Sequence, residues 1–165
     1  MINGNNSSIN NNKRRNPIPT IDIIIQEKID SNNNNNVLLV KRKKEPFKDY
    51  FSLPGGFVNK GERVEEAVRR EAEEELSIKV EPLDILGVYS DPSRDPRGHI
   101  MSTTFITKII KGELKARDDA AEIKWFNLNE INKLNLGFDH SQILSDYREW
   151  LKKKQTFWSS KYKKN

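Results

Sequence analysis

The sequence contains no cysteine. This absence excludes disulfide bonds, thiolate zinc sites and a cysteine nucleophile. No apolar run approaches the roughly 20 residues that are needed to span a bilayer, and the polar start of the chain lacks the apolar core of a signal peptide. We therefore expect a cytoplasmic protein that makes no contact with a membrane.

A strong charge imbalance is also lacking, since the 165 residues carry a net charge of only +5. A chain of this length suits one domain, which we expect at 17–154. Residues 1–16 are rich in Asn and Ser and too polar to bury a core, so we expect a disordered lead-in. A run of Asn at 30–36 is expected to be a loop insertion. Lysines crowd the end of the chain, where we expect a solvated basic tail at 155–165 and no nucleic-acid partner.

Apolar patterning predicts an alternation of strands and helices. β-Branched and apolar runs predict strands at 20–26, 37–42, 83–89, 101–110 and 123–126. Helical spacing of apolar residues predicts helices at 62–76 and 141–153, with a short one at 128–134. The elements are interleaved without a regular strand-helix-strand repeat. The expected fold class is therefore a mixed α/β or α+β sandwich.

The most acidic part of the sequence is the predicted helix 62–76. Glu71, Glu74 and Glu75 are spaced so that their carboxylates project from one helical face. Like charges at this spacing destabilise a helix by about 0.2–0.5 kcal/mol per pair. A hard divalent cation would offset this cost, because Mg²⁺ prefers oxygen ligands and shares them with substrate phosphates. An exposed, charged helix face is the alternative.

Three neighbouring features favour a metal site over an exposed face. The Gly55-Gly56 turn before the helix lets the backbone approach a ligand closely. Arg70 adjoins the acidic residues and can orient a carboxylate by bidentate pairing. Glu62 precedes Arg70 at the expected start of the same helix.

These residues resemble a known family signature. The Nudix signature is Gly, five residues, Glu, seven residues, Arg-Glu, an apolar residue, one residue, Glu-Glu, one residue, Gly and an apolar residue. Eight of its nine specified positions are matched here, by Gly56, Glu62, Arg70, Glu71, Ala72, Glu74, Glu75 and Ile78. The departure is Ser77, where the signature has a Gly that ends the helix in a left-handed conformation. Serine there is strained by about 1 kcal/mol, or the helix ends differently.

The resemblance implies a Nudix-type α/β/α sandwich with a mixed sheet and a catalytic loop-helix-loop. It implies a Mg²⁺ cofactor, for which Mn²⁺ could substitute. The implied metal ligands are Glu71, Glu74, Glu75 and the carbonyl of Gly56. Glu71 and Glu74 are also implied to act in catalysis, with Glu71 either a ligand or the residue that orients or deprotonates water.

Further residues are implied around this centre. Glu62 and Arg70 are expected to support the helix and its carboxylates. A second acid from outside the helix often completes such a site, and Glu122 is the candidate for this catalytic role, with Asp118 and Asp119 behind it. An exposed acidic turn is the alternative for these three.

Outside the signature, the chain resembles the ADP-ribose pyrophosphatases of the same superfamily. A proline about 15 residues beyond the signature is typical of that subgroup, and Pro92 lies 15 residues after Ser77. The resemblance rests on segments at 54–58, 90–99, 118–120 and 138–140.

The loop 90–99 suits a phosphosugar ligand. Its prolines stiffen it, so less entropy is lost on binding. Arg94 and Arg97 offer planar donor groups for phosphate or ribose oxygens. His99 either contacts substrate or caps the following strand, and Arg42 is a further candidate for substrate binding. A proline-rich surface turn is the alternative.

The expected reaction is hydrolysis of ADP-ribose to AMP and ribose 5-phosphate. Tyr50 and Phe51 either stack on adenine or belong to the core. The alternatives are another dinucleotide, nucleotide-sugar or nucleoside triphosphate pyrophosphohydrolase, and a non-catalytic Nudix-like ligand-binding module. The expected partner is a small nucleotide, and a homodimer is common among the enzymes that this chain resembles.

Overall fold

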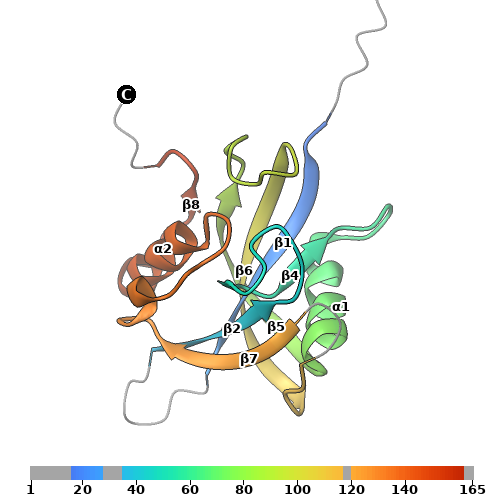
Figure 1. The fold of residues 1–165 in the computed structure, drawn as a ribbon, viewed down its shortest axis with the longest axis vertical. Coiled ribbons are helices and arrows are strands. Elements are labelled where there is room, and N and C mark those ends of the chain that lie inside the picture. The colour runs from blue at the N-terminus through green and yellow to red at the C-terminus, as the bar shows by residue number, and fades with distance from the viewer. Residues whose placement is uncertain (1–15, 28–34, 117–119, 162–165) are drawn as a thin grey trace, which may run out of the picture.

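The computed structural model describes residues 16–27, 35–116 and 120–161 (Figure 1). The polar lead-in at 1–15 and most of the Asn-rich insertion lie outside these ranges, so both remain predictions. Of that insertion, Asn36 begins a strand and its side-chain amide donates to Glu27 at 2.6 Å.

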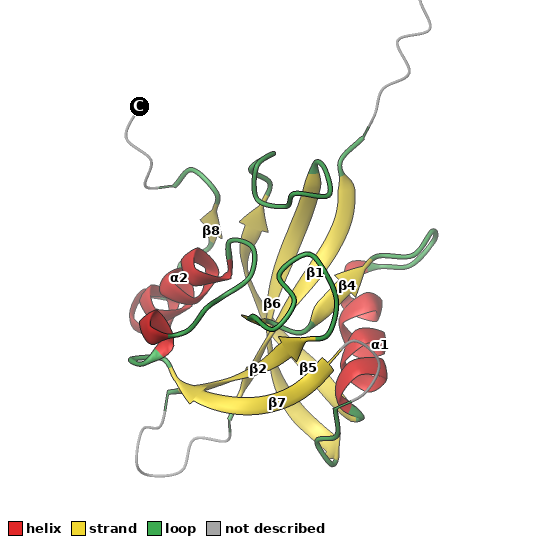
Figure 2. Cartoon of the chain, in the orientation of Figure 1, coloured by secondary structure: helices red, strands yellow, loops and turns green. Residues whose placement is uncertain are grey.

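The structure is built on one mixed eight-stranded sheet (Figure 2). Strands β1 and β6 run parallel, as do β5 and β8, and the remaining pairs are antiparallel. The main path is β3-β2-β1-β6-β5-β8, with β4 paired to β1 and β7 paired to β2. The strands are β1 Ile18–Gln26, β2 Asn36–Arg42, β3 Phe51–Ser52, β4 Gly55–Phe57, β5 Ile78–Tyr89, β6 Ile100–Gly112, β7 Ala120–Asn127 and β8 Phe157–Trp158.

Two helices pack on opposite sides of this sheet, α1 (Val64–Leu76) and α2 (His140–Lys153) (Figure 1). Each side has its own apolar cluster. Ile24 of β1 belongs to the cluster under α2, whereas Ile23 and Ile25 belong to the cluster under α1. Because both faces of β1 are covered, Ile23, Ile24 and Ile25 are all fully buried although successive side chains point to opposite faces. The predicted α/β/α sandwich with a mixed sheet is confirmed.

Several element boundaries differ from the prediction. Helix α1 begins after Arg63 rather than at Glu62, because the Glu66 carboxylate accepts the Arg63 N–H at 3.0 Å and caps the first turn. The helix predicted at 128–134 is reduced to the 3₁₀ turn Ile131–Lys133, in which the N–H groups of Lys133 and Leu134 each donate to the carbonyl oxygen three residues earlier at 3.0 Å. No helix in the described ranges is long and apolar enough to cross a membrane.

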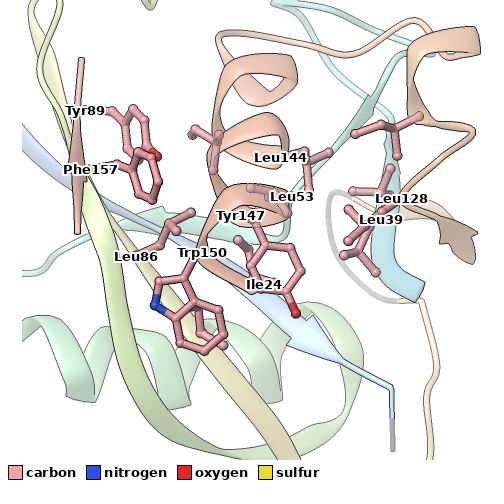
Figure 3. Packing of buried hydrophobic residues seen from close by; sticks show 14 residues of the cluster. Ile24, Leu39, Leu53, Leu86, Tyr89, Leu128, Leu144, Tyr147, Trp150 and Phe157 are labelled. Atoms are coloured by element: carbon pink, nitrogen blue, oxygen red, sulfur yellow. The ribbon is translucent and has the colours of Figure 1, made fainter. Parts of the chain in front are cut away.

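Part of the segment predicted to be a solvated tail, 155–165, contributes to the folded domain. Phe157 and Trp158 form β8, which pairs with β5 at Gly87 and Val88. Phe157 is 1% exposed and belongs to the cluster under α2 (Figure 3). Its burial explains why this part of the lysine-rich segment returns to the sheet.

Candidate active site

A cavity of about 290 Å³ lies where the acidic helix meets the sheet. Its walls come from β1, the turn that contains β4, one face of α1, the loop after β5 and the residues that lead into α2. The residues that line it include Asp22, Arg42, Gly56, Phe57, Arg70, Glu71, Glu75, Arg94, Arg97, Phe138 and His140. The topology thus gathers acidic, basic and aromatic side chains from these five parts of the chain and from Arg42 at the end of β2.

Two glutamates of α1 line this cavity beside the glycine turn. The Gly55 N–H donates to the Glu75 carboxylate at 3.2 Å. The Glu71 carboxylate fills the space in front of Gly56, where a Cβ atom would lie 2.2 Å from its Oε1. Gly55 has a φ of +151° and its own Cβ would lie 2.2 Å from the Ile21 carbonyl oxygen. Both glycines are therefore required for the close approach of β4 to its neighbours.

Arg70 holds the carboxylates of three glutamates. Its Nε and Nη2 donate to both carboxylate oxygens of Glu62, at 2.7 and 2.9 Å. Its Nη1 donates to Glu71 at 2.6 Å and to Glu74 at 3.1 Å. A further bond from Nη2 reaches the carbonyl oxygen of Phe57 at 2.9 Å. Arg70 therefore ties helix α1 to the preceding turn, as expected of a supporting residue.

The charges of these carboxyl groups are set by this arrangement. Hydrogen bonds from Arg70 and from the Asn59 N–H lower the pKa of Glu62 to about 2. Burial raises the pKa of Glu71, although Arg70 opposes the shift. Glu62 is thus ionised at neutral pH, and Glu71 is the more easily protonated of the two.

Glu74 is placed differently from Glu71 and Glu75. Its side chain is 52% exposed and it does not line the cavity. In the part of the chain that the structure describes, no three acidic or histidine side chains gather closely enough to hold a metal ion. Glu74 therefore lies apart from the cavity, and its expected role as a metal ligand remains a prediction.

Arg94 is buried in the wall of the cavity rather than free to receive substrate. Its Nε and Nη2 form a bidentate pair with Asp139 at 2.9 and 2.7 Å, and its Nη2 also donates to Asp22 at 3.2 Å. Its side chain is only 4% exposed. Arg94 nevertheless lines the cavity, and its expected contact with phosphate or ribose oxygens remains a prediction.

Asp22 is the centre of this buried network. It accepts a hydrogen bond from the Ser102 hydroxyl at 2.6 Å, and His140 Nε2 lies 3.4 Å from its other oxygen. The His140 Nδ1 accepts the Leu53 N–H at 2.9 Å, so the ring proton lies on Nε2 and faces Asp22. Burial alone would raise the pKa of Asp22, but His140, Arg94 and Ser102 together lower it to about 2.

Arg97 and Arg42 lie against the aromatic wall of the cavity. The Arg97 guanidinium lies 5.2 Å from the Phe57 ring centroid and 5.4 Å from that of Phe138. Arg42 lies 4.9 Å from the Phe138 centroid. Asp95 accepts from Nε and Nη2 of Arg97 and fixes its orientation. Both arginines line the cavity, and their expected contact with substrate remains a prediction.

Other predicted residues do not reach the cavity. His99 lies 3.3 Å from the Ser90 carbonyl oxygen and immediately precedes β6, which fits the capping alternative. Glu122 is exposed on β7, opposite Lys41 in the ladder, so the structure does not bring it to the site. Phe51 packs in the core against Phe126, and the Tyr50 ring lies tilted beside Phe47, with 5.8 Å between the ring centroids. Asp118 and Asp119 lie outside the described residues.

Four residues of the site were missed by the sequence analysis, Asp22, His140, Phe57 and Phe138. Asp22 carried a usable signal, because it is the one charged residue in the isoleucine-rich 18–26 run. A carboxylate in a strand that is buried on both faces requires polar partners. Phe57, Phe138 and His140 lie in the segments 54–58 and 138–140 that carried the resemblance, although the sequence assigned no role to them.

Comparisons with known proteins agree with this geometry. The model of the NUDIX domain family matches residues 27–147. The chain is similar to an ADP-ribose pyrophosphatase of Methanocaldococcus jannaschii, with 55% identity over 108 residues that cover 66% of this chain and 63% of that protein. It thus spans less than two thirds of the length of this relative.

Solved structures show the same fold. A MutT/nudix family protein from Enterococcus faecalis superposes with a TM-score of 0.70 at 31% identity, covering 83% of this chain and 63% of that one. The NUDIX domain of Shewanella oneidensis NrtR, solved in complex with ADP ribose, gives 0.71 at 26% identity and covers 83% and 90%. Since the family match covers well over half of the sequence and includes the whole acidic helix, the chain belongs to the Nudix family.

Proposed function

We propose that this protein hydrolyses the pyrophosphate bond of ADP-ribose and releases AMP and ribose 5-phosphate. The observation that carries the proposal is the cavity, in which carboxylates of α1 lie opposite arginines that rest on aromatic rings. Such a cavity suits a ligand with two phosphates and a flat or sugar-like end. The 55% identity to a protein named ADP-ribose pyrophosphatase supports the same substrate.

The cavity residues also fit a divalent metal ion. The groups on offer are carboxylate oxygens of Glu71 and Glu75 together with the backbone of Gly56, and the missing side chain of Gly56 leaves room for the Glu71 carboxylate. A set of hard oxygen donors suits Mg²⁺, which we propose as the cofactor, with Mn²⁺ as a substitute. When bound, such an ion neutralises pyrophosphate charge and makes a bound water nucleophilic near neutral pH.

The chain itself supplies the orientation and the proton acceptor. Arg70 fixes Glu71 by a 2.6 Å hydrogen bond and anchors to Glu62, which stays ionised. In the proposed reaction a water oxygen bonds to one phosphorus, the bridging P–O bond breaks, and the bridging oxygen leaves with the other phosphate. Glu71, whose pKa is raised by burial, is suited to accept the water proton.

Substrate orientation is assigned to the opposite wall. Arg97 and Arg42 provide positive charge for the phosphates, while the rings of Phe57 and Phe138 support both guanidinium groups. Asp95 holds Arg97 in place from behind. Arg94 acts from within the wall, through Asp139 and Asp22.

One assay tests the proposal. The purified protein is incubated with Mg²⁺ and a panel of ADP-ribose, diadenosine polyphosphates, NADH and nucleoside triphosphates, and the products are separated. AMP and ribose 5-phosphate from ADP-ribose at low substrate concentration are expected. Cleavage of the triphosphates alone would contradict the substrate. Tight ADP-ribose binding without turnover of any compound would instead identify a ligand-binding module.

A further inference from the structure

The chain after α2 returns to the sheet, and Ser159 contacts the start of the loop that carries Arg94 and Arg97. Strand β8 pairs in parallel with the end of β5, Phe157 opposite Gly87. A Cβ at Gly87 would lie 2.3 Å from the Phe157 carbonyl oxygen, so the missing side chain allows this close contact. Gly87 of β5 therefore allows the two segments to lie this close together.

The segment is fixed by its own contacts. Phe157 is buried among the aromatic and aliphatic side chains under α2 (Figure 3). The Lys161 N–H donates to the Trp158 carbonyl oxygen at 3.0 Å, and its ammonium nitrogen lies 4.3 Å from the Phe157 ring centroid. The residues between Trp158 and Lys161 are thereby held in a closed turn.

Ser159, within this turn, bonds to the start of the 90–99 loop. Its hydroxyl oxygen accepts the backbone N–H of Ser90 at 2.7 Å and that of Asp91 at 3.2 Å. These two amides follow directly after β5, where the strand has no further partner to receive them in the described sheet pairing. One side-chain oxygen thus satisfies two successive donors at the loop's origin.

The loop then turns tightly toward the cavity. The Asp91 carbonyl accepts the Arg94 N–H at 3.0 Å, and its carboxylate accepts the Ser93 N–H at 3.0 Å. This turn delivers Arg94 to Asp22 and Asp139. The position of Asp91 therefore determines where the arginine-bearing part of the loop enters the cavity wall.

We propose that Ser159 is a positioning residue for substrate binding. It acts through the backbone of Ser90 and Asp91 on the loop that carries Arg94 and Arg97. The proposal rests on the proposed function, since it gives this loop a role in holding ADP-ribose. Ser159 lies beyond residue 147, where the family match ends, so the role belongs to this chain's own C-terminal segment.

Steady-state kinetics on point variants test this role. Ser159→Ala removes the acceptor and should raise the KM for ADP-ribose about fivefold or more, as expected from the loss of one or two hydrogen bonds. The kcat should stay within about twofold, because α1 and its glutamates are untouched. Ser159→Thr keeps the hydroxyl and should restore the KM. Ser160→Ala, at an exposed neighbouring serine, is the matched control.

A purely structural role would give a different pattern. If Ser159→Ala lowers only the melting temperature and leaves the KM unchanged, positioning is overturned. Hydrogen exchange at Ser90 and Asp91 provides a second measurement that needs no activity, and faster exchange is expected in Ser159→Ala than in Ser160→Ala. If the wild type fails to cleave ADP-ribose, the proposed function fails, while equal exchange in the two variants would separately overturn the positioning role.

Discussion

Glu71, Glu74 and Glu75 share one helical face but not one environment. Glu71 is 13% exposed and Glu74 is 52% exposed, and both accept hydrogen bonds from Arg70. Glu75 faces the glycine turn and lines the cavity. A charge that acts on a substrate in a water-poor cavity has more effect than one in solvent. We therefore expect loss of charge at Glu75 to lower activity strongly.

The first prediction concerns this charge. Glu75→Gln keeps the size of the side chain and should lower kcat by at least about 10², as the loss of an electrostatic group in an active site does. The measurement is kcat with ADP-ribose at saturating Mg²⁺. Glu73→Gln, at a glutamate 61% exposed and away from the cavity, is the matched control and should be near normal. Near-normal activity in Glu75→Gln would contradict the assignment.

Gly56 leads to a second prediction at this scale. In Gly56→Ala, the new Cβ would lie 2.2 Å from Glu71 Oε1, so the carboxylate must move. A displacement of about 1 Å costs up to roughly 10²-fold in rate, so kcat/KM should fall by roughly 10- to 100-fold. Circular dichroism should show an unchanged fold. An active variant would mean that Glu71 can act from another position.

At the scale of elements, helix α1 ends as its sequence indicated. Ser77 has φ 60° and ψ 27°, which is a left-handed conformation. The family signature has Gly at this position. The Ser77 hydroxyl is also buried and has no hydrogen-bond partner among the residues that the structure describes. Both features cost stability, but neither touches the cavity.

Replacing this residue should therefore stabilise the protein without altering catalysis. Ser77→Gly should raise the free energy of unfolding by about 1 kcal/mol, because Gly adopts the left-handed conformation without strain. Urea denaturation measures the gain. Ser77→Ala removes the hydroxyl but keeps the Cβ. If both variants gain equally, the unsatisfied hydroxyl rather than the backbone is the cause.

Local signals predicted α1 and its supporting residues, whereas contacts between distant segments were not predictable. The Glu62–Arg70 pair follows from spacing along one short stretch. In contrast, Ser159 meets Ser90 across 69 residues, and nothing near the lysine-rich end indicated that Phe157 would be buried. Likewise, the residue type of Arg94 suggested a contact with phosphate. Its ion pair with Asp22 could not be predicted, because the two residues lie 72 positions apart in the sequence.

For the molecule as a whole, the buried network around Asp22 joins parts that are far apart in the chain. Asp22 lies on β1, Ser102 on β6, and His140 begins α2, while Arg94 comes from the loop after β5. The network therefore connects the sheet to the loop after β5 and to the start of α2. Since its central carboxylate must be ionised to keep these bonds, the stability of the whole fold should depend on pH.

The sign follows from the pKa of Asp22, which is lowered from 3.8 to about 2 in the folded protein. A lowered pKa contributes stability above the unfolded value, and this contribution is lost as the pH falls from about 4 toward 2. The shift corresponds to about 2 kcal/mol.

Urea denaturation at pH 6 and pH 3 should show the loss in the wild type. Asp22→Asn should be less stable at pH 6 and should lose less on acidification, because its amide does not titrate. Other carboxylates, such as Glu62, titrate in both proteins, so the difference between the two proteins is the quantity to compare. Equal losses would mean that Asp22 does not carry this dependence.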